Sequence, residues 1–150
     1  MEGLSPELFA MMAECAMPVT FDAGRTIFHE GEPANRFYLL LEGAVALQAR
    51  LANQGVALVT TLRSGDVLGW SWLFPPYTWH FDAVAIEASR ATFFYGTWLR
   101  QLGEEHPQLG YELMRRMAEV LMRRLQATRQ QWLATAHLPG AVKRSVGHPA

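Results

Sequence analysis

The spacing of hydrophobic and polar positions changes twice along this chain and divides it into three parts. Near the N-terminus, Ser5-Pro6 is typical of a helix start, and the apolar residues that follow recur at helical spacing as far as Cys15. From about residue 19 to residue 97, short runs rich in β-branched and aromatic residues alternate with glycine-containing turns. This part predicts short antiparallel strands that close into a sandwich or a barrel.

The predicted strands lie between the glycines of this middle part. Their ranges are 26–28, 36–42, 44–51, 56–62, 82–88 and 91–95. Asn53-Gln54-Gly55 separates two of them and predicts the tip of a hairpin, because asparagine and glycine tolerate the left-handed backbone of tight turns. After the last strand, residues 98–102 predict a short helix.

The third part is a long helical pattern over residues 108–136, which contain no proline and a single glycine, Gly110. About 29 residues at a rise of about 1.5 Å form a helix roughly 43 Å long. One side of it carries Leu113, Met117, Leu121, Leu125, Thr128 and Trp132 at three- and four-residue spacing. This stripe predicts pairing with a second copy, and packing of the whole stripe on its own domain is the alternative. Residues 139–150 begin with Pro139-Gly140 and predict a flexible tail.

Composition narrows the class of protein. The 150 residues carry a formal net charge of −1, so no overall field draws the chain to nucleic acid or to a membrane. The one cysteine excludes an intrachain disulfide framework and an all-cysteine zinc site, and it fits a reducing compartment. No apolar run reaches about 18 residues and the N-terminus lacks a signal-peptide pattern, so we expect a cytoplasmic protein without a membrane span.

The segment from Gly65 to Ala83 carries the candidate chemistry. Gly65-Asp66 and Gly69 have the frame of a turn whose backbone faces a ligand, yet no lysine or arginine lies between Ser64 and Arg90. Six aromatic residues stand within twelve positions of this segment: Trp70, Trp72, Phe74, Tyr77, Trp79 and Phe81. They either line a pocket for an apolar or planar ligand or fill the space that a ligand would occupy.

In this order, the parts resemble the cyclic-nucleotide-binding domain of the catabolite activator family of bacterial regulators. The residues that carry the resemblance are 21–39, 41–45, 65–69 and 123–128. The resemblance implies a mainly β fold with flanking helices: an antiparallel β-roll, or double-stranded β-helix, followed by a long C-terminal dimerisation helix. It places the domain at residues 1–138, with the roll at about 19–97 and the helix at about 108–136.

The family's phosphate-binding cassette implies where a ligand would bind and how this chain departs from the pattern. In the family, backbone amides and an arginine hold the cyclic phosphate, and a glutamate after the glycine binds the ribose. Here Trp70 holds the glutamate's place, and the arginine's place falls on Trp79 or His80. Pro75 and Pro76 also remove two amide donors. Loss of two charged contacts costs about 3–6 kcal/mol, so we expect no tight binding of an ordinary cyclic nucleotide.

The predicted ligand-binding residues follow from this resemblance, and the ligand is nucleotide-like or another small molecule. They are Gly69, Trp70, Ser71, Trp72, Trp79, His80, Phe81, Asp82, Ala83, Thr128 and Arg129. His80 offers a titratable contact for an anion or is a structural residue, and Asp82 bonds nearby backbone or caps a strand. Thr128 matches a position where the family helix touches the purine across the dimer. Arg129 is a candidate to bring a guanidinium to the pocket, and a solvated helix face is the alternative.

The sequence therefore predicts a free-standing regulatory sensor or adaptor domain that dimerises through residues 108–136 and signals through an unidentified protein partner. About a dozen residues follow the long helix, too few for the family's DNA-binding helix-turn-helix, so we expect no DNA binding. A ligand-free dimeric interaction module is the alternative. A cupin-like metal enzyme is a remote one, since His29, His80 and His106 lack the His-x-His spacing of its metal site. The sequence identifies no catalytic residue, metal site or cofactor.

Overall fold

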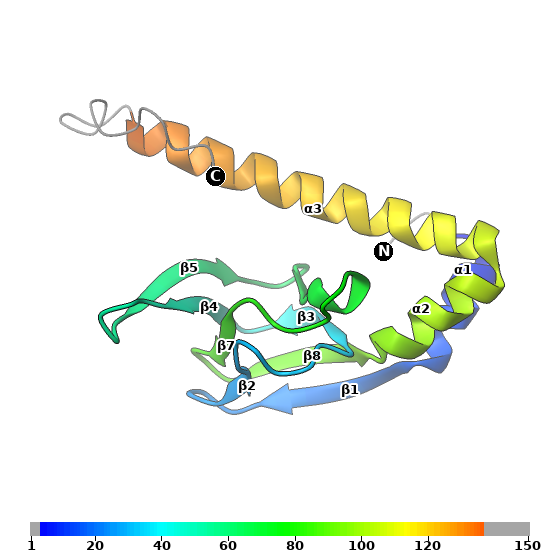
Figure 1. Cartoon of the computed structure of the whole chain (residues 1–150), viewed down its shortest axis with the longest axis horizontal. Coiled ribbons are helices and arrows are strands. Elements are labelled where there is room, and N and C mark those ends of the chain that lie inside the picture. The colour runs from blue at the N-terminus through cyan, green and yellow to red at the C-terminus, as the bar shows by residue number, and fades with distance from the viewer. Residues whose placement is uncertain (1–3, 137–150) are drawn as a thin grey trace. The chain divides into compact units, whose positions relative to one another are not determined.

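The computed structural model of the protein describes residues 4–136, and its larger part is a roll of two four-stranded antiparallel sheets (Figure 1). One sheet has the strand order β1-β8-β3-β6 and the other β2-β7-β4-β5. The strands are β1 (Ala16–Phe21), β2 (Thr26–Phe28), β3 (Phe37–Glu42), β4 (Val45–Arg50), β5 (Val56–Leu62), β6 (Val67–Leu68), β7 (Asp82–Ala85) and β8 (Ser89–Phe94). The predicted fold class, a mainly β roll with flanking helices and a long C-terminal helix, is confirmed.

The interior of the roll is packed with apolar side chains from both sheets. Successive residues of a strand point to opposite faces, so every second residue faces the interior. Tyr38 makes edge-to-face contacts with Phe21 and Phe93, with ring centroids 5.5 and 5.6 Å apart. The buried cluster consists of Phe28, Ala34, Tyr38, Leu40, Val45, Leu62, Leu68, Trp79, Ala83 and Ala91. Aromatic rings therefore form a large share of the packing between the two sheets.

Six of the eight strands lie where the glycine-punctuated pattern predicted them. The predicted hairpin tip also forms: the amide of Leu51 donates to the carbonyl of Gly55 at 2.9 Å, and Gln54 adopts a φ of 67°. β1 was missed because Pro18 argues against a strand, but β1 lies at the edge of its sheet, where a missing amide donor is tolerated. β6 was missed because its two residues are too few to show an alternating pattern.

Two short helices, α1 (Pro6–Glu14) and α2 (Gly96–Glu105), pack against each other at one end of the roll (Figure 1). The amide of Leu8 donates to Ser5 Oγ at 3.2 Å, so the predicted serine cap of α1 forms. Trp72, in the single-turn helix η1 (Ser71–Leu73), is fully buried beside α2. A Cβ atom at Gly96 would lie 2.7 Å from the Trp72 ring, so this close approach requires glycine.

The long helix α3 (Pro107–Ala136) starts one residue before the predicted range of 108–136. The structure divides into two compact units between Tyr111 and Glu112, so α3 begins in the first unit and forms the described part of the second. Within the described residues, no helix is long and apolar enough to cross a membrane. The predicted flexible tail, residues 139–150, lies outside the described residues, and the domain limit at residue 138 stays a prediction.

Candidate functional site

The segment between β6 and β7 meets the core of the roll at Gly69. This glycine has a φ of +104°, a conformation that L side chains rarely adopt. A Cβ atom there would lie 2.9 Å from Cζ3 and 3.0 Å from Cη2 of Trp79. Two features therefore require glycine at position 69: the positive φ of its backbone and the indole ring of Trp79 that packs against it.

Trp79 is a core residue. Its exposed fraction is 3%, and its ring stacks on Phe28 with centroids 3.8 Å apart and planes 7° apart. The resemblance left two positions open for the family's arginine, and the structure separates them: Trp79 lies inside the roll, whereas His80 is exposed. The buried position of this pair therefore carries a stacked indole and no permanent cation.

The main chain around Trp79 is paired with the loop that precedes β3. The amide of Trp79 donates to the carbonyl of Glu32 at 3.0 Å, and the amide of Gly31 donates to the carbonyl of Trp79 at 2.8 Å. Pro75 and Pro76, a few residues earlier, have no amide hydrogen at all. Three backbone positions of this stretch therefore offer no free donor to an anion: the amide of Trp79 is bonded already, and Pro75 and Pro76 have none.

The other predicted site residues at the start of the segment have separate surroundings. Trp72 stacks on Phe37, with ring centroids 4.8 Å apart, and belongs to the core. Trp70 is half-buried. Ser71 Oγ lies 3.1 Å from Nδ1 of His80, so these two side chains meet across the surface of the segment. The rings of Trp72 and Trp79 thus fill space, as the second of the two interpretations of the aromatic segment requires.

An arginine from another part of the roll reaches Trp79. Arg36 stands just before β3, and its Cζ atom lies 5.5 Å from the ring centroid of Trp79 and 5.9 Å from that of Tyr38. Its Nε donates to the hydroxyl of Tyr38 at 2.7 Å, and its Nη1 donates to Oδ1 of Asn35 at 3.0 Å. The segment has no basic residue of its own, so this guanidinium is the cation that the fold brings to the indole ring.

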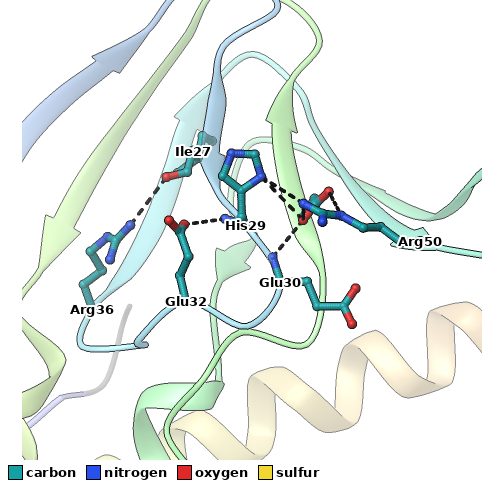
Figure 2. A network of polar contacts seen from close by, with 7 residues as sticks. Ile27, His29, Glu30, Glu32, Arg36 and Arg50 are labelled. Carbon is teal, nitrogen blue, oxygen red and sulfur yellow. Dashed lines mark hydrogen bonds and ion pairs between the residues drawn. The ribbon is translucent and has the colours of Figure 1, made fainter. Parts of the chain in front are cut away.

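Asp82, the first residue of β7, is the centre of a polar network, and its partners His29, Glu30 and Arg50 are labelled in Figure 2. Its Oδ1 accepts from the amide of Glu30 at 2.7 Å, and its Oδ2 accepts from Nε of Arg50 at 3.2 Å. Nδ1 of His29 lies 3.8 Å from Oδ1. Desolvation raises the pKa of this carboxyl, but the Glu30 amide, Arg50 and His29 together outweigh it, so the pKa lies below its usual value. The ionised carboxylate thus ties the loop after β2 to β4 and β7.

The remaining predicted residues lie in different places. Ala83 is fully buried in the roll and Phe81 is partly buried. Thr128 and Arg129 are exposed on α3, in the second unit, and their predicted role toward a ligand stays a prediction. Among residues 4–136, no group of three or more His, Cys, Asp or Glu side chains is placed to hold a metal ion.

Comparison with known proteins decides the family. The family model described as a cyclic nucleotide-binding domain matches residues 18–106, which include the whole segment between β6 and β7. The chain belongs to the cyclic nucleotide-binding domain family. The resemblance drawn from the sequence motifs is therefore confirmed.

Three known proteins show what this cyclic nucleotide-binding domain is similar to. A CRP-like cAMP-activated global transcriptional regulator of Mycobacterium tuberculosis is 29% identical over 147 residues, which are 97% of this chain and 64% of that protein, so the chain spans less than two thirds of its length. A cyclic nucleotide-binding protein structure from Geobacter metallireducens matches with a TM-score of 0.74 and 30% identity, covering 82% of this chain and 89% of that one. The Catabolite Activator Protein of Thermus thermophilus shares the fold, with a TM-score of 0.65, 22% identity and coverage of 87% and 59%.

Sequence reasoning about this cyclic nucleotide-binding domain missed the residues that reach the segment from elsewhere in the chain. Asp82 is 32 residues from Arg50 and 52 from Glu30, and neither partner stands out in the local sequence. Arg36 left one signal. It is two residues from Tyr38, and residues two apart in extended backbone share a face, which fits the hydrogen bond from Arg36 Nε to the Tyr38 hydroxyl.

Proposed function

We propose that this cyclic nucleotide-binding domain is a regulatory domain that does not bind ordinary cyclic AMP or cyclic GMP tightly and senses a different small molecule. One observation carries the proposal. The buried ring of Trp79 packs on Gly69 and stacks on Phe28, and Trp79 is one of the two positions that the family resemblance offers for the phosphate-binding arginine. An indole is a single neutral donor, so it does not supply the charge-assisted bonds of a guanidinium.

The ribose contact supports the same proposal. Trp70 follows Gly69, where the family has a glutamate, and an indole N–H donates but accepts no hydrogen bond from a ribose hydroxyl. The amide of Trp79 is bonded to the carbonyl of Glu32 and adds nothing for a phosphate. Loss of the two charged contacts weakens binding by about 3–6 kcal/mol, or roughly a hundredfold to ten-thousandfold in affinity.

Calorimetric titration of the full chain with cyclic AMP and cyclic GMP tests this prediction. We expect no saturable binding at nucleotide concentrations up to about 100 μM, as a loss of that size implies. The cAMP-activated regulator of Mycobacterium tuberculosis, titrated in the same buffer, is the positive control. A dissociation constant in the low micromolar range for either nucleotide would show that the site retains the family's usual ligand.

We further propose that the domain dimerises through α3. Leu121 and Leu125 are one helical turn apart and are 47% and 61% exposed, and Met122 beside them is also exposed. An apolar stripe at this spacing fits the seam between two long helices. Thr128 and Arg129 would contact a ligand bound by the second copy only in such a dimer, so their predicted role is part of the same proposal.

Replacing Leu125 with glutamate is expected to convert the dimer to a monomer, because the seam would then bury two unpaired carboxylates. Sedimentation velocity over a series of micromolar concentrations measures the change. Gln126→Glu adds the same charge at the neighbouring exposed position and should leave the dimer intact. A wild-type chain that sediments as a monomer at every concentration would contradict the proposed dimer.

The output of the domain is proposed to pass to a protein partner in the cytoplasm. Val56 and Leu58 are exposed on β5, the edge strand of its sheet, and provide an apolar surface that a protein can cover. A ligand-free interaction module is the second candidate function, because the burial of Trp79 also fits a roll that holds no ligand. A thermal-shift screen separates the two, since a bound ligand must raise the Tm of the wild-type chain.

A further inference from the structure

The Arg36 guanidinium lies beside the rings of Trp79 and Tyr38, and the described residues include no carboxylate partner for it. Among the described residues, none of the ion pairs includes Arg36. It is partly buried, and a charge that leaves water is costly unless an opposite charge compensates it. Its two cation–π distances, 5.5 and 5.9 Å, exceed the 4.1 Å of Arg100 over Tyr77, so no ring holds it in close stacking.

The hydrogen bonds of Arg36 leave part of its donor set unused. Nε donates to Tyr38 at 2.7 Å, Nη1 to Asn35 at 3.0 Å and Nη2 to the carbonyl of Ile27 at 3.4 Å, the last of which Figure 2 shows. A guanidinium has five N–H donors, so one remains on each terminal nitrogen. Two N–H groups, one on each nitrogen, are what a carboxylate accepts in a bidentate pair.

Close to Arg36, the buried indole N–H of Trp79 lacks an acceptor. The indole Nε1 of Trp79 is buried and has no hydrogen-bond partner, and the whole residue has an exposed fraction of 3%. Buried donors without an acceptor are rare in folded proteins, because each one forfeits the hydrogen bond that it made with water. The guanidinium and this N–H belong to neighbouring groups, since Arg36 lies over the ring of Trp79.

We propose that Arg36 is the anion anchor of this domain and that it binds a small planar carboxylate, whose oxygen also satisfies the indole N–H of Trp79. This inference rests on the proposed function, because it names the ligand class of the same site. The cation at this site would then come from the residue just before β3, and not from the segment between β6 and β7 as in the family. The two aromatic rings beside the guanidinium, those of Tyr38 and Trp79, favour a ligand with a flat apolar body.

A single carboxylate fits this donor set better than a phosphate dianion. One guanidinium balances one negative charge, and the amide of Trp79 is already bonded to Glu32. Phosphate presents more oxygens and more charge than these donors satisfy. Guanidinium geometry matches a planar carboxylate in two parallel bonds, whereas a lysine at this position would supply only a point charge.

Benzoate is the probe, and its neutral isostere benzamide is the control. The readout is the set of indole N–H resonances of the five tryptophans in a ¹⁵N-labelled full chain, with the Trp79 signal assigned through Trp79→Phe. We expect benzoate to shift the Trp79 resonance saturably and benzamide to leave it in place. Arg36→Gln should weaken benzoate binding about tenfold or more, because a charge-assisted pair is lost. Arg25→Gln removes the same charge from an exposed turn and should bind benzoate as the wild type does.

Several outcomes would overturn the inference: a wild-type Trp79 resonance that benzoate does not move, an equal shift with benzamide, or tighter binding of inorganic phosphate than of benzoate. If Arg36→Gln does not fold, Arg36→Lys decides, with several-fold weaker binding expected and unchanged affinity counting against the bidentate pair. The proposed function fails separately, through micromolar binding of cyclic AMP, whatever benzoate does.

Discussion

Replacing Trp79 with alanine is expected to lower the free energy of unfolding by about 4 kcal/mol, in the range for a fully packed aromatic side chain. The ring is 3% exposed, stacks on Phe28 at 3.8 Å and packs on Gly69, so its removal leaves a cavity between the two sheets. For a chain of this length the loss corresponds to a fall in Tm of roughly 8–16 °C. Urea denaturation followed by circular dichroism measures the free energy.

Phe74→Ala is the matched control for this variant. Phe74 lies in the same segment but is 57% exposed, so its loss should cost less than about 0.5 kcal/mol. Free indole should partly restore the Tm of Trp79→Ala, because the vacated space has the shape of that ring and an apolar cavity binds a matching apolar molecule. Equal stability of the two variants would mean that Trp79 covers an open pocket and does not fill the roll.

The turn between β3 and β4 carries the second large effect: Gly43→Ala should destabilise the fold by about 3–5 kcal/mol. Gly43 has a φ of +99°, and a Cβ atom there would lie 2.3 Å from Oγ of Ser89 and 2.7 Å from the carbonyl oxygen of Ala88. Backbone strain and overpacking therefore add. The added methyl group would also disturb the buried Ser89 hydroxyl, which accepts from the amide of Ala44 at 3.2 Å.

Gly65→Ala separates these two contributions. Gly65 has a similar φ of +92°, but a Cβ atom there would meet nothing within 4 Å, so strain alone should cost about 1–2 kcal/mol. Chemical denaturation of both variants under the same conditions gives the comparison. If the two alanine variants lose the same free energy, the contact with Ser89 carries no cost, and Gly43 is needed only for its backbone conformation.

The local pattern predicted much of the fold because each signal acts over a few residues. β2 and β5 have the predicted bounds, the Asn53-Gln54-Gly55 tip forms its hairpin, and Ser5 caps its helix. Alternation, turn residues and caps depend on neighbours in the chain, so they are visible in the sequence. β1 was hidden by Pro18, whose effect depends on whether the strand lies at a sheet edge, and that position follows only from the pairing of strands.

The candidate site depended on contacts that no local pattern contains. The sequence showed that the segment between β6 and β7 lacks a basic residue, but it left the arginine's place open between Trp79 and His80. The tertiary structure decided between them. Hydrogen bonds join the main chain of Trp79 to the loop before β3, and Trp79 is buried whereas His80 is exposed. The contacts of Arg36 with Trp79 and of Arg50 with Asp82 likewise join residues far apart in the sequence.

By itself, the sequence determined a chain of short strands punctuated by glycines, with a segment poor in charge and rich in aromatic rings, since composition and short-range spacing are properties of the chain alone. Its motifs carried the resemblance to the cyclic nucleotide-binding family, which the family model confirmed. Only the tertiary structure decided which ring is buried on Gly69 and which cation lies over it. Those contacts join residues far apart in sequence, and their partners are set by how the two sheets close on each other.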